Sequence, residues 1–454
     1  MSSTKQPYSL TITEAASAIA SGELTPSQLV KSCLERIDAV DDAIKAWALV
    51  DRQGALATAR QLEQELAKGQ RRGALHGIPV GIKDIFYTAG LPTEAGAKAW
   101  AGFVPDYDAT SVARLKEAGA IVLGKTHTTE FAFFDPAPTR NPWNTEHTPG
   151  GSSSGSGAGV AAGMCPAALG SQTMGSVLRP AAYNGIVGFK PQYGRISVYG
   201  VVPLSPTLDH VGILARTVKD VALVFQAIAG NDPKDALSLN EPVPDCLAAL
   251  EKQPPPPRLG LVRAFFYDHA DEEMRRHTDE IVARLRQAGA TIEEITPPPS
   301  FTTIIDNARI FMAAEAAVSH REGFARHGDK YRAGIRKLIE DGQAVSSAEY
   351  KKALKVRLQQ CAEMEPLLYK TDALITPGIQ GPAPHGLSST GNPVMQGPWT
   401  IMGVPSISLP SGLSQSGLPL SIQLAGPPKA EDRLLAVARW CESVLKVDLR
   451  PPLG

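Results

Sequence analysis

The chain has 454 residues, 43% hydrophobic and 20% charged, a composition typical of a soluble globular protein with one large domain or two ordinary ones. Its 45 basic residues nearly cancel its 46 acidic residues, so no long-range field attracts nucleic acid or an anionic membrane. We therefore expect a small-molecule ligand, and neither a nucleic acid nor a membrane as a partner.

The cysteines and the N-terminal residues indicate the cellular setting. The five cysteines lie far apart and show no CxxC spacing, which argues against a disulfide framework and against a metal site. Residues 1–25 lack the basic stretch and apolar run of a secretory signal. No segment has the length and hydrophobicity of a membrane span. We expect the protein to be cytoplasmic.

The first 70 residues are predicted to form helices. Thr25 is a capping residue, Pro26 follows at the first helical position, and Gln28 stands three residues after the cap, which together mark a helix start. Apolar residues then recur at helical spacing. A second helix is predicted from about residue 55 to residue 68.

Residues 71–240 are predicted to form an α/β core. Short apolar strands are expected at 78–82 and 120–123, with a helix between them. From Thr148 to Leu178 the chain has no charged residue and is dominated by Gly, Ser and Ala. Such a composition often marks a flexible linker. The apolar residues within it and the strand-like run at 186–189 instead predict that this segment packs in the interior.

The remaining residues divide into two parts. Residues 254–370 are more helical and more charged, and are predicted to form a covering region. Strands are expected at 373–375, 406–409 and 420–424, followed by an amphipathic helix at 431–444. We therefore predict a single α/β domain over residues 1–454, with a mixed central β-sheet surrounded by helices.

Two motifs match nucleotide-binding or hydrolase patterns without the context that these need. Residues 119–126 fit the P-loop pattern, but the four residues between its glycines read as a strand, and the helix precedes the motif. Residues 151–155 fit the GxSxG pattern, but no strand is predicted before them. A Ser-His-Asp hydrolase would also need a late histidine, and His385 keeps that alternative open. Cys165 is predicted to be a small core residue, which argues against a cysteine nucleophile.

Three further segments point to amide chemistry when read as a unit: GIPVGIKD at 77–84, PGGSSSGS at 149–156 and LGSQTMGS at 169–176. Together they resemble the amidase signature family. The resemblance continues at 179–191, 403–408 and 417–423, covers most of the chain, and is weakest between about residues 240 and 370. Within the family, the segments around the serines are most similar to malonamidase-type bacterial amidases.

The resemblance implies an amidase signature fold and a mechanism without cofactor or metal. Ser176 would attack the amide carbonyl and form an acyl-enzyme. Ser152, joined to Gly151 by a cis peptide bond, would relay the proton to Lys83, the terminal base. Lys83 can act only as the neutral amine, a form that burial beside apolar strand residues favours.

The developing oxyanion would bind to backbone N–H groups of Thr173, Met174, Gly175 and Ser176. The bond cleaved would be a carboxylic amide, and an ester or a carbamate (urethanase activity) is also compatible with this chemistry. Members of the family are often homodimers, so a homodimer is a further expectation.

Three positions depart from the commoner family pattern. Met174 replaces one of the paired glycines before the nucleophile, and its side chain would narrow or reshape the acyl pocket. Gln172 stands where Asp is commoner, and Arg179 lies three residues after the nucleophile instead of two. The last two departures argue against the glutaminyl-tRNA amidotransferase subunit, which is kept as the alternative function. A non-catalytic binding protein is a third class, disfavoured because all three triad residues are retained.

Two features of the sequence favour different classes of substrate. Arg179 could bind a substrate carboxylate through its guanidinium, or it could have a purely structural role. The aromatic residues of the 131–134 segment, with Phe131 and Phe134 as the candidates for substrate binding, would instead favour a larger apolar substrate.

Overall fold

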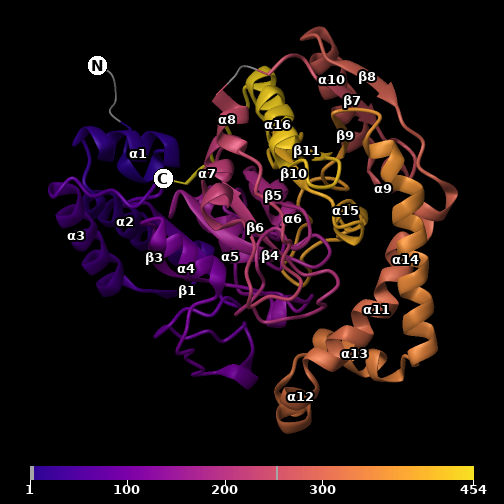
Figure 1. Ribbon diagram of the computed structural model, residues 1–454, viewed down its shortest axis with the longest axis horizontal. Coiled ribbons are helices and arrows are strands. Elements are labelled where there is room, and N and C mark those ends of the chain that lie inside the picture. Colours follow the sequence, from indigo (N-terminus) through magenta and orange to yellow (C-terminus); the bar gives the residue numbers. More distant parts are fainter. Residues whose placement is uncertain (1–4, 252–253, 454) are drawn as a thin grey trace.

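The computed structural model describes residues 5–251 and 254–453. At its centre lies one mixed sheet, which in these ranges has 11 strands in the order β1-β3-β2-β4-β6-β5-β10-β11-β9-β7-β8 (Figure 1). The strands are β1 (Trp47–Val50), β2 (Pro79–Lys83), β3 (Ile121–Thr126), β4 (Ala167–Gln172), β5 (Val187–Lys190), β6 (His210–Ala215), β7 (Arg258–Leu261), β8 (Thr291–Glu294), β9 (Ala373–Pro377), β10 (Ser406–Leu413) and β11 (Pro419–Ala425). The predicted α/β fold with a mixed sheet and flanking helices is confirmed.

The helices pack around this sheet in groups. Helices α5 and α6 contact each other and the central strands, whereas α11 packs on α13 and α14 at the side of the molecule away from α1, α2 and α3 (Figure 1). The α-helices are α1 (Ile12–Ser21), α2 (Pro26–Ile44), α3 (Arg52–Ala67), α4 (Thr110–Glu117), α5 (Ser154–Ala161), α6 (Leu178–Asn184), α7 (Val218–Ile228), α8 (Cys246–Glu251), α9 (Phe266–His269), α10 (Glu272–Gln287), α11 (Ile304–Ser319), α12 (Arg321–His327), α13 (Ala333–Ala344), α14 (Ser347–Leu368), α15 (Gly397–Ile401) and α16 (Glu431–Leu445).

The N-terminal helix start is as predicted. Thr25 caps α2, its side chain accepts a hydrogen bond from the Gln28 N–H, and the Gln28 side chain accepts one from the Thr25 N–H. This reciprocal pair satisfies two N–H groups that the first helical turn leaves without intrahelical partners. In the described ranges, no helix combines the length and apolarity that crossing a bilayer requires.

The strand β2 lies between two parallel neighbours, β3 and β4. Parallel strands end at the same edge of a sheet, so Lys83 at the end of β2 lies beside the end of β4 at Gln172. The residues of the apparent P-loop, Gly124 to Thr126, belong to β3 itself. The strand predicted at 120–123 also falls in β3 from Ile121 onward, so this segment is a strand and not a phosphate-binding loop.

The uncharged segment is part of the interior and not a linker. Every residue from Thr148 to Ala162 and from Met164 to Pro191 is buried, and these residues form α5, β4, α6 and β5. Small side chains are required where backbones approach closely. A Cβ on Gly155 would lie 2.1 Å from the Ala46 carbonyl oxygen and 2.5 Å from the His127 nitrogen.

The region 254–370 differs from the predicted covering layer in one respect. It is mainly helical, with α9 to α14, but β7 and β8 also belong to it and extend the central sheet in parallel beyond β9. Each of these strands has only four residues, which is too short for a clear periodic signal. In addition, β8 has no buried residue that would mark it as a strand of the core. The predicted strands at 373–375, 406–409 and 420–424 form β9, β10 and β11.

Candidate active site

Lys83 is the centre of a buried polar cluster at the end of β2. Its side chain is fully buried, and its Nζ lies 2.7 Å from Ser152 Oγ and 2.8 Å from Ser171 Oγ. The sheet places Ser171 in β4, next to β2, while Ser152 precedes α5. The structure thus brings Lys83 and Ser152 into direct hydrogen-bonding contact, across 69 residues of sequence.

The surroundings of Lys83 favour its neutral form. Burial lowers the pKa of the Lys83 ammonium well below its ordinary value, because the charged form loses its hydration. The negative charge of Asp209 acts in the opposite direction and is the smaller effect. The hydrogen-bonding partners of the Lys83 amine are the hydroxyls of Ser152 and Ser171. A neutral amine between hydroxyls keeps a lone pair with which it can accept a proton.

Ser152 and Ser176 lie in two segments that are separated by β4 in sequence and contact each other in the fold. The peptide bond between Gly151 and Ser152 is cis, as the family resemblance implies. Ser176 lies in the turn between β4 and α6, and its carbonyl oxygen accepts a hydrogen bond of 3.3 Å from the Ser153 N–H. Within the described residues no hydrogen bond joins the Ser152 and Ser176 hydroxyls. Such contacts are often long without substrate and shorten in the reactive complex.

The backbone from Thr173 to Ser176 faces a small cavity. Among the residues that the structure describes, none of these four N–H groups donates a hydrogen bond to a protein acceptor, and all four residues line the cavity. Consecutive free N–H groups are the donors that stabilise a negative oxygen in acyl transfer. The cavity volume is about 20 Å³, enough for a single water molecule, so the residues around it are closely packed.

The aromatic residues of 131–134 divide between the cavity and the core. Phe134 lines the cavity, together with Phe133 of the same segment. Phe131 does not. It is buried, stacks on Tyr331 at 4.8 Å between ring centroids and contacts His320 at 4.7 Å. Phe131 therefore anchors this turn to the helical region, apart from the residues that line the cavity.

Arg179 lines the same cavity from α6 and has no carboxylate partner in the described ranges. One of its terminal nitrogens, Nη2, donates to the Gly151 carbonyl at 2.7 Å and to Thr390 Oγ1 at 3.1 Å. Its Nε and Nη1 atoms are buried without a hydrogen-bond partner. Burial lowers the pKa of Arg179 to about 10, so the guanidinium remains charged at neutral pH. A buried cation with free N–H groups beside a nucleophile is suited to a substrate anion.

The geometry agrees with a comparison against families of known proteins. The Amidase family model matches residues 28–435, a range that contains the lysine, both serines and the free N–H groups. The chain belongs to the amidase signature family.

Individual relatives of this family member include an amidotransferase subunit and a peptide amidase. A glutamyl-tRNA(Gln) amidotransferase subunit from Carboxydothermus hydrogenoformans is 37% identical over 474 residues, covering 96% of this chain and 97% of the relative. The native peptide amidase of Stenotrophomonas maltophilia is 28% identical, with a TM-score of 0.87, over 99% of this chain and all of that one. A third relative comes from a vestigial protein complex that reveals the evolutionary origins of an s-triazine catabolic enzyme. It is 28% identical, with a TM-score of 0.90, over 97% of this chain and all of that one.

The structure adds residues to this amidase signature site that local sequence did not indicate. Leu204, Met312 and Pro393 line the cavity from three separate parts of the chain, and Thr400 donates to the Met174 carbonyl from behind it. Ser171 also belongs to the site, since its hydroxyl contacts the Lys83 amine directly. No spacing rule links these positions to the triad, because only the fold brings them together.

Other groups that could have carried chemistry lie elsewhere. The ring of His385 packs against His147 at 5.3 Å and does not line the cavity, which leaves the Ser-His-Asp alternative without its histidine. Burial raises the pKa of the Cys165 thiol to about 12, so this thiol stays protonated and unreactive. Among the described residues no group of three or more His, Cys, Asp or Glu side chains is placed to hold a metal ion.

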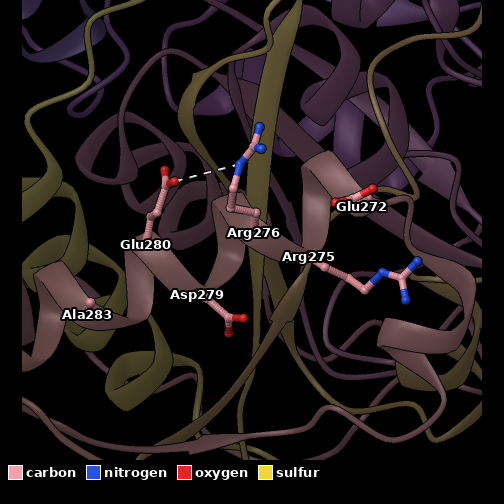
Figure 2. A pocket seen from close by; sticks show the side chains of 6 residues that line it. All are labelled: Glu272, Arg275, Arg276, Asp279, Glu280 and Ala283. Atoms are coloured by element: carbon pink, nitrogen blue, oxygen red, sulfur yellow. Dashed lines mark ion pairs between the residues drawn. The ribbon is translucent and has the colours of Figure 1, made fainter.

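A second, open hollow lies on α10 and differs in character. Six residues of this one helix line it, and five of them are charged. Arg276 and Glu280 form an ion pair, with 3.9 Å between Nε and Oε1 (Figure 2). Both members of that pair are more than half exposed. Alternating charges of this kind are typical of a solvated helix face.

Proposed function

We propose that this protein cleaves carboxylic amide bonds through an acyl-enzyme on Ser176. The observation that carries the proposal is the buried Lys83 in contact with Ser152, next to a cavity lined by Ser176 and by free N–H groups. Ser176 Oγ attacks the carbonyl carbon, while its proton passes through Ser152 to the Lys83 amine. The oxyanion accepts hydrogen bonds from the N–H groups of 173–176. The C–N bond then breaks as the proton passes to the leaving amine.

Water completes the cycle by the same route in reverse. It attacks the acyl carbon and gives a proton to the relay, and Ser176 takes a proton back as the acid leaves. The same steps would cleave an ester or a carbamate, since only the leaving group differs. No step in this sequence depends on a cofactor, and a homodimer stays a prediction.

The substrate that fits best is an amide that also carries a carboxylate. Arg179 is buried, charged and only partly hydrogen-bonded, and it lines the cavity that Ser176 lines. A carboxylate would supply the acceptors that Nε and Nη1 lack, and charge-assisted bonds of this kind contribute about 1.5–3 kcal/mol each. This supports a malonamidase-like specificity for small acid amides.

The alternative function, a glutaminase-type amidotransferase subunit that works with a partner, has the stronger support from curated relatives. The relative from Carboxydothermus hydrogenoformans matches over nearly the whole length of both chains, at higher identity than the peptide amidase. Glutamine carries both a carboxamide and a carboxylate, so it suits the same triad and the same Arg179. The departures at Gln172 and Arg179 therefore weigh less against this alternative than the sequence alone indicates.

A substrate panel separates the two functions. Wild type and Ser176→Ala would be assayed on malonamate, glutamine, p-nitroacetanilide and an aryl carbamate. Hydrolysis by the isolated wild type that is lost in Ser176→Ala would support a free-standing hydrolase. Glutamine cleavage that begins only when amidotransferase partner proteins are added would support the alternative. Activity that survives in Ser176→Ala would show that the nucleophile is wrongly assigned.

The role of Arg179 is tested with the same panel. We expect Arg179→Ala to raise KM for malonamate or glutamine by about 10–100-fold, because the substrate carboxylate loses charge-assisted hydrogen bonds. The KM for the neutral p-nitroacetanilide should change far less. An equal loss on both substrates would instead assign Arg179 to holding the Gly151 carbonyl, and hence to a structural role.

A further inference from the structure

Two carbonyl groups of the turn 173–177, which contains Ser176, are fixed by hydrogen bonds. The Met174 carbonyl accepts a hydrogen bond of 2.9 Å from Thr400 Oγ1. The Gly175 carbonyl accepts one of 2.9 Å from the backbone N–H of Arg179. Thr400 is fully buried in α15 and does not line the cavity. In a planar trans peptide the C=O and N–H bonds point in opposite directions. Holding the Met174 oxygen toward Thr400 therefore directs the Gly175 N–H toward the cavity.

Gln172 fixes Thr400 in turn. The Oε1 atom of Gln172 accepts hydrogen bonds of 2.9 and 3.0 Å from the N–H groups of Val177 and Leu178. Only an oxygen can accept two N–H donors, so the amide nitrogen must be the atom that faces Thr400 Oγ1, at 2.9 Å. Gln172 is fully buried, and water does not compete for these bonds.

The neutral amide sets the direction of this hydrogen-bond chain. A threonine hydroxyl has a single proton to donate. Because Gln172 Nε2 donates to the Thr400 oxygen, the Thr400 proton is available for the Met174 carbonyl, which is closer than the alternative Gln396 carbonyl at 3.3 Å. A carboxylate at position 172 would attract that proton instead and leave the Met174 carbonyl without its donor.

We propose that Gln172 and Thr400 are positioning residues that hold the Met174–Gly175 peptide so that the Gly175 N–H meets the developing oxyanion. This inference rests on the proposed acyl-enzyme function of Ser176. It concerns residues that touch no reacting atom: Thr400 acts from 226 residues away in sequence, and Gln172 acts through Thr400. Their contribution is realised when negative charge develops on the substrate oxygen, which is when oriented donors stabilise it most.

The test uses a reaction that needs no knowledge of the natural substrate. A fluorophosphonate phosphonylates an activated serine: the Ser176 oxygen–phosphorus bond forms, fluoride leaves, and the serine proton passes to the Ser152–Lys83 relay. Negative charge develops on a phosphoryl oxygen at the same donors. The labelling rate would be measured for wild type, Thr400→Val, Thr400→Ser, Gln172→Glu and the double variant Gln172→Glu/Thr400→Val. Melting temperatures would establish that each variant is folded.

We expect Thr400→Val to label about 10–100-fold more slowly, somewhat less than the loss from removing an oxyanion donor outright. Thr400→Ser, which keeps the hydroxyl, should recover most of the rate. Gln172→Glu should also be slow, and the double variant should lose little beyond the slower single variant, because both act through one hydrogen-bond chain. On a panel substrate, the loss should fall on kcat while KM stays near the wild-type value.

Three outcomes distinguish the inference from the proposed function. Wild-type labelling by a folded Thr400→Val, or by Gln172→Glu if the valine variant does not fold, would overturn the positioning role. Additive losses in the double variant would show that the two residues act separately, which also contradicts it. In both cases the absence of labelling in Ser176→Ala would leave the nucleophile assignment intact. Labelling of Ser176→Ala at the wild-type rate would overturn the proposed function itself.

Discussion

Lys83 and Lys125 occupy neighbouring parallel strands, and both side chains are fully buried, yet only Lys125 faces a carboxylate. In the register of β2 and β3, Ile82 pairs with Lys125 and Lys83 pairs with Thr126, so the two lysines lie one position apart. Lys125 Nζ lies 3.2 Å from Asp84 Oδ1, whereas among the described residues the hydrogen-bonding partners of the Lys83 amine are hydroxyls. Lys125 is thus half of a buried ion pair, whereas Lys83 is the base of the proposed mechanism, so we expect their substitution to have opposite effects on stability.

Lys83→Met should abolish activity without unfolding the protein. Methionine keeps an unbranched side chain of similar length but removes the proton acceptor, and loss of a general base costs about 10²–10⁴-fold in rate. No carboxylate loses an ion-pair partner, and an apolar side chain removes the cost of burying the amine. We expect a melting temperature at or above that of wild type, measured beside kcat/KM. Retained activity would contradict the role of Lys83 as the base.

Lys125→Met should destabilise the protein. Lys125 also donates to the Phe86 carbonyl at 2.9 Å and to Thr93 Oγ1 at 2.6 Å, so its loss removes these hydrogen bonds and leaves the buried Asp84 carboxylate without the cation that faces it. Breaking one side of a buried ion pair costs about 3–5 kcal/mol in the free energy of unfolding. Urea denaturation of both lysine variants would measure the contrast. Equal stability of the two would show that the Asp84 pair contributes nothing.

Glu130 should make stability depend on pH. Burial raises its pKa from 4.5 to about 7. Between these values the folded protein binds a proton that the unfolded chain has released, so folding stability from this group falls as the pH rises through that window. Glu130→Gln removes the titration and keeps a side-chain oxygen that can accept the Arg332 N–H, as Glu130 does.

The measurement is the melting temperature of each protein at several pH values. The melting temperature of Glu130→Gln should rise relative to that of wild type between about pH 4.5 and 7, and this difference in melting temperature should stay constant above pH 7. Glu322→Gln is the matched control, since its side chain is 84% exposed. A difference that does not change with pH would mean that Glu130 keeps its ordinary pKa.

Met174 should limit the size of the acyl group. It lines a cavity of only about 20 Å³ beside Ser176. Met174→Ala removes most of this side chain while retaining the backbone N–H, so kcat/KM for amides with a larger acyl group should rise about tenfold relative to small ones. Met364→Ala is the control, because Met364 is also buried but lies in α14 and does not line the cavity. The same change in preference for both variants would exclude a direct role of Met174.

Much of the site was predictable because its signals are local. The glycine- and serine-rich segments around Ser152 and Ser176 lie within about thirty residues of each other, and their lack of charge correctly indicated an interior position. The capping residues at Thr25 and Gln28 act within a single turn of helix, so the sequence alone was sufficient to locate the start of α2. The chemistry of Lys83 required burial, which its apolar strand neighbours indicated.

The tertiary structure decided what depends on contacts between distant segments. The sequence could not place Phe131 in the aromatic cluster with Tyr331, nor Thr400 behind the Met174 carbonyl. The free N–H groups of Arg179 emerged only from packing, because a guanidinium has partners or lacks them according to what the fold places around it. Local propensity and periodicity determine helices, strands and buried faces, whereas the lining of an active site is set by how those elements pack in three dimensions.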